Sequence, residues 1–221
     1  GSILFADGGA VTFNIGEAKI EGLTAGTNVI LQANNSITLN NLADNTLTLP
    51  TGGSLTMQTT TGNITFLDTA DKILASGAGT ISISAGGNAT LGALQTAGGG
   101  VTLSANGATG LSVGAITTGG GPLQIDAQNA ITLNGAVNLG GGTAVLNANK
   151  DGVGAQAFAM ATGTSITTTN ATPGAVTINV NTAAGGTGDA IVEGITVGNG
   201  GAIGIQTYWS YTADWGNILA A

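Results

Sequence analysis

The acidic side chains are the residues of this chain with the clearest capacity for chemistry. Glu17 and Glu21 are four residues apart, and Asp68 and Asp71 are three residues apart. Two carboxylates held about 5–10 Å apart across a sugar-sized groove can hydrolyse a glycosidic bond. Asp68 and Asp71 lie in a turn between strand-like segments, however, so we expect this pair to form a solvated corner.

The residue types that most other catalytic sites need are missing. The chain has no histidine and no cysteine, which excludes Ser-His-Asp and Cys-His catalysis and imidazole or thiolate metal ligands. The phosphate-binding glycine motifs and the aspartate ladder of a calcium loop are also absent. An enzyme that acts on an anionic polysaccharide needs clustered cations, whereas Lys19, Lys72 and Lys150 are far apart in sequence. We predict no enzyme, no cofactor and no metal.

Composition excludes two further classes of protein. The net charge is −8, with three lysines and no arginine, whereas a nucleic-acid binder needs clustered cations. No stretch of about 18 apolar residues occurs, so we predict no membrane span. Forty glycines cluster between apolar segments, where tight turns need them. Aromatic residues are 4% of the chain, so Ile, Leu, Val and Ala must fill the core.

The glycines separate a repeated strand-like phrase. Ile81–Ala85 (ISISA) returns 20 residues later as Val101–Ala105 (VTLSA). Alternation of apolar and small polar residues is typical of a strand with one buried face. The same five-residue motif also begins at residues 29, 55, 123, 144, 176 and 203, and we call it the first phrase of each repeat. Together with residues 81 and 101, these starting points are 26, 26, 20, 22, 21, 32 and 27 residues apart. A second phrase follows most of the first phrases after 8 to 10 residues, and a fainter third follows in several repeats.

Three short strands in each repeat match one turn of a parallel β-helix. We predict an all-β, right-handed parallel β-helix with about eight coils of roughly 20–27 residues. Ile83, Leu103 and Ile125 should then stack in one interior file. The expected division is a divergent N-terminal coil or cap (1–27), regular coils (28–148), an irregular insertion forming a helical turn or a loop (149–175), and further coils (176–221).

Two polar patterns accompany the second phrase. Its middle residue is Thr38, Thr65, Thr90, Ser112 or Thr132, which predicts an outward ladder of hydroxyls. Threonine is favoured on exposed strand positions, and an ice-binding or ligand-binding face is the alternative. An asparagine precedes the phrase at Asn35, Asn63, Asn88 and Asn129. Asparagine tolerates left-handed backbone and its amide can bond from coil to coil, so we expect these four to be structural turn residues.

The aromatic residues gather near the C-terminus, at Tyr208, Trp209, Tyr211 and Trp215. Such a cluster can plug the open end of the core as an aromatic cap. Alternatively, it forms an interaction surface for a further domain, a second subunit or a glycan, because aromatic rings are good anchors.

Residues 78–137 resemble the repeat region of filamentous-haemagglutinin-like exoproteins. The likeness lies in the motif [Ile/Val/Leu]-Thr-Leu-x-Ala with Gly-Gly or Asn-x turns, and it extends over about residues 28–148. These bacterial adhesins are exported by two-partner secretion and fold as right-handed parallel β-helices. The resemblance implies an extracellular or cell-surface stalk or adhesin, with a host, cell-surface or matrix glycan or protein as ligand. The N-P-N motifs of the family's secretion domain are absent here.

Two other functions stay open. Uncovered solenoid ends present unpaired strand edges, so the chain could be a subunit that polymerises end to end into a surface filament or sheet. It could also be a carbohydrate-active or ice-binding β-helix.

Overall fold

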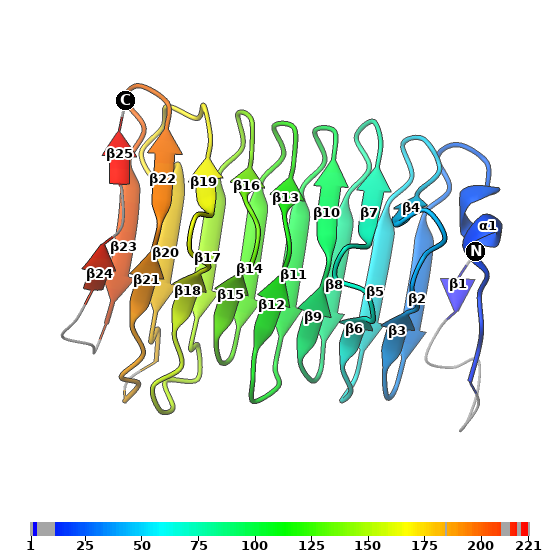
Figure 1. Cartoon of the computed structure of the whole chain (residues 1–221), viewed down its shortest axis with the longest axis horizontal. Coiled ribbons are helices and arrows are strands. Elements are labelled where there is room, and N and C mark those ends of the chain that lie inside the picture. Colours follow the sequence, from blue (N-terminus) through cyan, green and yellow to red (C-terminus); the bar gives the residue numbers. More distant parts are fainter. Residues whose placement is uncertain (1, 4–11, 184, 209–212, 216–217, 221) are drawn as a thin grey trace.

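The computed structural model of the chain describes residues 2–3, 12–183, 185–208, 213–215 and 218–220. Its strands form three parallel sheets that run side by side along a solenoid, with the N- and C-terminal regions at opposite ends (Figure 1). Sheets B and C each have eight strands, and sheet A has nine. The predicted parallel β-helix of about eight coils is therefore confirmed.

Each coil contributes one strand to each sheet. Sheet A contains β1 (Ser2–Ile3), β2 (Val29–Ala33), β5 (Leu55–Thr59), β8 (Ile81–Ala85), β11 (Val101–Ala105), β14 (Leu123–Ala127), β17 (Ala144–Ala148), β20 (Val176–Val180) and β23 (Ile203–Thr207). Sheet B contains β3 (Ile37–Leu39), β6 (Ile64–Phe66), β9 (Ala89–Leu91), β12 (Leu111–Val113), β15 (Ile131–Leu133), β18 (Phe158–Met160), β21 (Ala190–Val192) and β24 (Ala213–Trp215). Sheet C contains β4 (Thr46–Thr48), β7 (Lys72–Ala75), β10 (Ala93–Thr96), β13 (Ile116–Thr117), β16 (Val137–Asn138), β19 (Ser165–Thr167), β22 (Gly194–Val197) and β25 (Ile218–Ala220).

The first phrases of the sequence stack in register to form sheet A. Ile83 pairs with Leu103, which pairs in turn with Ile125, and all three side chains are at most 1% exposed. In β5, β8, β14, β17 and β20 the first, third and fifth residues are buried, while the second and fourth are half-buried on the outer face. The predicted interior file is confirmed, because the two-residue period of a strand puts the same residues inward in every coil.

A column of glycines lies at the corner where the chain passes from sheet C to sheet A. The column contains Gly53, Gly79, Gly99, Gly121 and Gly142, each two residues before a first phrase. A Cβ added at any of them would overlap the carbonyl oxygen of the residue one coil below. At Gly99, for example, that oxygen belongs to Gly79. Glycine is needed here because successive backbones approach too closely for any side chain.

Buried threonine hydroxyls close the same corner. Thr118 Oγ1 donates to the carbonyl of Gly121 at 2.6 Å, and Thr96 Oγ1 donates to the carbonyl of Gly99. Thr168 Oγ1 reaches one coil below, to the carbonyl of Gly142 at 2.6 Å. Carbonyl groups that the tight turn would leave buried without partners are thereby satisfied.

Residues 149–175 differ from the expected irregular insertion. They contain β18 and β19, which continue sheets B and C in register, so the segment is part of an ordinary coil. Phe158 is fully buried in the core, and the segment 155–161 contains no helical turn. The long step from 144 to 176 reflects mainly the connection 149–157 between β17 and β18, with a smaller contribution from the connection 168–175 between β19 and β20; both add length without displacing a strand.

The N-terminal segment forms a cap with a helix that the sequence did not predict. Glu17–Glu21 forms helix α1, and residues 12–15 are irregular. β1 adds to sheet A beside β2, and α1 packs against β4 of sheet C. Both lie at the N-terminal end of the solenoid (Figure 1).

The glycine column gives a direct test of the fold. We expect Gly99→Ala to lower the free energy of unfolding by about 1–3 kcal/mol, because the added methyl group must push apart two stacked backbones. Gly141→Ala is the matched control, since a Cβ there meets nothing within 4 Å. Chemical denaturation followed by circular dichroism measures both variants, and equal stabilities would contradict the close approach.

Candidate functional surfaces

The first acidic pair binds backbone rather than facing a groove. Glu17 and Glu21 are one helical turn apart on α1, so both carboxylates lie on the same side of the helix. Glu21 Oε1 accepts a hydrogen bond from the backbone N–H of Thr48 at 2.9 Å, and Glu17 Oε2 accepts one from Ala43 at 3.5 Å. The helix thus presents two acceptors to the first coil of the solenoid.

The second acidic pair is not the solvated corner that the sequence suggested. Asp71 is fully buried, and both of its carboxylate oxygens lie 3.3 Å from the backbone nitrogen of Leu42. Asp68 is half-buried, and its Oδ1 accepts from the N–H of Ala70 at 2.9 Å. The expectation fails for Asp71 because the backbone of a neighbouring coil needs an acceptor at this corner.

The carboxylates gather where sheet C ends. The N–H of Leu49 in the first coil donates to the carbonyl of Leu74 in the next coil. Because N–H groups alternate in direction along a parallel strand, the N–H groups of Thr46 and Thr48 point outward, away from the next coil and toward the free edge of sheet C. The Thr46 N–H bonds to Asp44 Oδ1 at 3.0 Å and the Thr48 N–H to Glu21. We call Glu17, Glu21 and Asp44 the carboxylate cap. It replaces the carbonyl oxygens that a preceding coil would supply.

Helix α1 depends on the solenoid for its stability. It has five residues, and its N-terminal neighbour Gly16 provides no side-chain cap. A helix this short is unstable alone, so contacts outside it must hold it. Ile20 is 7% exposed and belongs to the same core cluster as Leu47 of β4. The helix therefore covers both the end of the core and the edge of sheet C.

Three of the four predicted turn asparagines bond to a neighbouring coil. Asn63 Oδ1 accepts from the N–H of Asn88 at 2.8 Å, and Asn88 Oδ1 accepts from the N–H of Thr109 at 2.9 Å. Asn129 Nδ2 donates to the carbonyl of Gly107 at 3.0 Å. Asn35 contacts the next coil through its backbone instead, because its carbonyl oxygen occupies the space that a Cβ on Gly62 would need.

The left-handed backbone expected at these four positions occurs elsewhere. The non-glycine residues with positive φ in the described ranges are Asn45, Asn149 and Asn181, with φ of 58°, 48° and 59°. Asn149 and Asn181 are fully buried, and their amide groups lie 2.6 Å apart. The sequence reasoning missed both. Their signal is an asparagine directly after a first phrase, as the first residue of the long connections 149–157 and 181–189.

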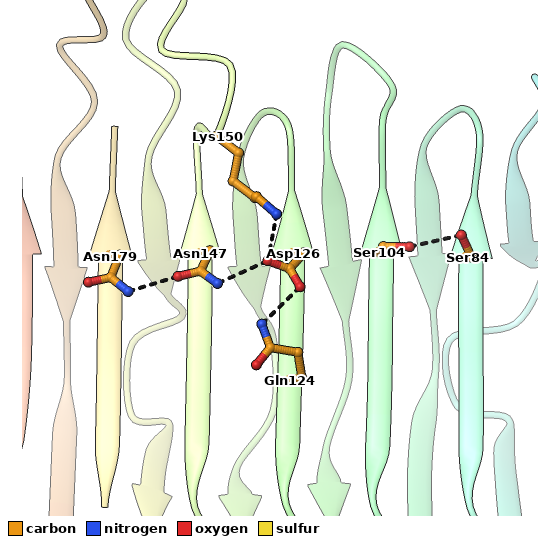
Figure 2. A network of polar contacts seen from close by, with 7 residues as sticks. All are labelled: Ser84, Ser104, Gln124, Asp126, Asn147, Lys150 and Asn179. Atoms are coloured by element: carbon orange, nitrogen blue, oxygen red, sulfur yellow. Dashed lines mark hydrogen bonds and ion pairs between the residues drawn. The ribbon is translucent and has the colours of Figure 1, made fainter. Parts of the chain in front are cut away.

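A line of polar side chains runs along the outer face of sheet A, at the fourth residue of each first phrase. This outer polar file contains Gln32, Gln58, Ser84, Ser104, Asp126, Asn147, Asn179 and Gln206. Figure 2 shows two of its hydrogen-bonded stretches. Ser104 donates to Ser84 at 2.9 Å, while Asn179 donates to Asn147 at 2.8 Å and Asn147 to Asp126 at 2.9 Å.

Asp126 is the charged member of the outer polar file. Its carboxylate accepts from Lys150 Nζ at 2.9 Å and from Gln124 Nε2 at 2.8 Å (Figure 2). Partial burial acts to raise the pKa of Asp126, but the hydrogen bonds it accepts and the charge of Lys150 outweigh burial. The pKa of this carboxyl is therefore lowered. The pair is partly exposed, so its contribution to stability is modest.

The second phrases form the predicted ladder on sheet B. Thr38, Thr65, Thr90, Ser112 and Thr132 are stacked in register. Ala159 and then Ile191 continue the same row, so the hydroxyls stop at β15. Ile191 is 44% exposed. This single column, which ends at β15, gives no specific support to an ice-binding face.

The aromatic cluster is described in part. Tyr208 directly follows β23 and is 53% exposed, so its ring is not enclosed by the core. The backbone of Trp215 ends β24 and pairs with Val192. Trp209 and Tyr211 lie outside the described residues. The aromatic cap and the interaction surface both stay predictions.

The described residues contain no group of three or more acidic side chains arranged to hold a metal ion. They also contain no helix with the length and apolar character to cross a bilayer. Comparisons with protein families, curated proteins and solved structures found no match. The resemblance to filamentous-haemagglutinin-like exoproteins therefore depends on the repeat sequence alone.

The lowered pKa of Asp126 predicts a pH-dependent contribution to stability. An unfolded aspartate titrates near pH 3.9, so the native carboxylate stabilises the fold above about pH 4 and loses this effect as pH falls through the lower native pKa. We expect Asp126→Asn to cost about 0.5–1 kcal/mol at pH 7 and to match the parent at low pH. Asp151→Asn, in an exposed connection, is the control. A cost independent of pH in denaturant titrations would contradict this assignment.

Proposed function

We propose that this chain is a structural module of a secreted or surface-attached bacterial protein, in which it acts as a rigid stalk and displays an adhesive surface. The observation that carries the proposal is the stack of three parallel sheets around one core, which runs from the first coil to the last. The repeat sequence supports the same conclusion through its likeness to exported adhesins.

Stiffness follows from how the coils are joined. Each coil pairs with the next through three strands at once, and the inward side chains of neighbouring coils belong to one continuous core cluster. Bending the solenoid must stretch strand ladders on one side while compressing packed side chains on the other. Protein cores resist such compression because they are packed as densely as organic crystals.

The outer faces suit a neutral, polar ligand. No charged residue occurs between Lys72 and Asp126, so several successive coils expose Ser, Thr, Asn and Gln without formal charge. Hydroxyl and amide groups can bond to the hydroxyl groups of a glycan without a counter-ion. A glycan or a neutral protein surface is accordingly the class of ligand we propose.

The stalk role predicts that the length of the module can be changed by whole coils. Residues 81–122 contain two coils, so inserting a second copy after Pro122 should lengthen the solenoid by about 10 Å, at about 4.8 Å for each strand step. Small-angle scattering measures the maximum dimension, and an insertion with the same residues in scrambled order is the control. A compact or unfolded product from the ordered insertion would argue against a stalk of independent coils.

Surface display is tested on intact cells of the organism that makes the protein. Antibodies raised against the purified chain should label unpermeabilised cells or the culture medium, and the chain should bind saturably to at least one class in a panel of glycans and matrix proteins. Labelling that requires permeabilised cells would contradict the proposed location. Failure to bind any surface, with labelling intact, would leave the stalk role and remove the adhesive one.

A further inference from the structure

We propose that the N-terminal edge of sheet C is a latent docking edge for a second copy of this chain, and that α1 keeps it closed. The juxtaposition of the outward N–H groups of β4 with the carboxylates of α1 and of the adjoining turn carries the inference. The proposal concerns assembly in solution and does not depend on the adhesive role.

The outward N–H groups at this edge all have acceptors. The outward N–H groups of Thr46 and Thr48 bond to Asp44 and Glu21. In the turn just before β4, the N–H of Ala43 bonds to Glu17. A strand that approaches this edge must displace Glu21 before it can pair. An exposed parallel edge without such cover is a template for strand addition.

A second copy offers a complementary strand for this edge of sheet C. The strand that ends sheet C on the other side is β25, which pairs in parallel with β22 through Ile195 and Ile218. Docking of one copy's β25 against another copy's β4 would repeat the coil-on-coil pairing that joins every neighbouring pair of strands in sheet C. Because the two edges differ, such a contact is head-to-tail and continues into a filament.

The test compares substitutions that remove the same charge and leave different acceptors. Glu17→Ala with Glu21→Ala removes both acceptors and changes the net charge from −8 to −6. Glu17→Gln with Glu21→Gln makes the same charge change but keeps an oxygen that can accept from Thr48 and Ala43. Asp151→Ala with Glu193→Ala gives the same net charge away from the cap. Circular dichroism establishes that each variant keeps its β-structure, and Glu21→Ala alone is the milder variant if the double alanine variant does not fold.

We expect the double alanine variant to assemble at a concentration at least tenfold below any at which the parent assembles. Light scattering and negative-stain imaging should show short filaments, with the glutamine variant and the Asp151/Glu193 variant behaving like the parent. The bonds of Thr196 to β19 and the register of β25 on β22 place the N–H groups of Ile218 and Ala220 on the free edge of β25. Adding Ala220→Pro to the alanine variant removes one of these donors and should abolish the filaments. Monomeric alanine variants would overturn the proposal. So would assembly by the glutamine variant to the same extent, or filaments that persist with Ala220→Pro.

Discussion

Parallel stacking of backbone on backbone, one strand spacing apart, is the constraint on which the rest of this structure depends. It requires every coil to place its strands in register with the coil below, and it therefore fixes which side chains point inward. It also brings turns into close contact, so the corner between sheets C and A excludes side chains at Gly53, Gly79, Gly99, Gly121 and Gly142. The hydroxyls of Thr96, Thr118 and Thr168 then satisfy the carbonyl groups that this contact buries.

The same constraint explains what the acidic residues do. Inside the stack, each backbone N–H in a strand finds the carbonyl of a neighbouring coil. At the first coil of sheet C there is no such neighbour, and carboxylates take over as acceptors. Glu17 and Glu21 are spaced for one face of a helix, which is the spacing that the edge of β4 needs. Their spacing thus matches the backbone donors at this end of the solenoid.

Most of the fold could be predicted from the sequence because its determinants are local and repeated. The phrase ISISA and its relatives show the strand period directly, and their recurrence implies stacking, as the pairing of Ile83 with Leu103 demonstrates. Features that occur once could not be predicted in this way. Helix α1 has no repeat to identify it and is held by tertiary contacts, and Asp71 is buried because a distant backbone N–H, that of Leu42, lies beside it. β18 and β19 were missed because a long connection hid them, although Phe158–Met160 alternates like other strands.

The two long connections between sheets A and B, at 149–157 and 181–189, show how such a protein can vary without losing its frame. Buried Asn149 and Asn181 anchor their first residues, and the Thr187 N–H bonds to the carbonyl of Gly154, so the upper loop rests on the lower one. The strands before and after each loop keep the alignment of the shorter coils. Residues added at this corner therefore extend away from the solenoid axis and leave the spacing between coils unchanged. New sequence can be inserted there, by evolution or by design, without changing how the strands stack.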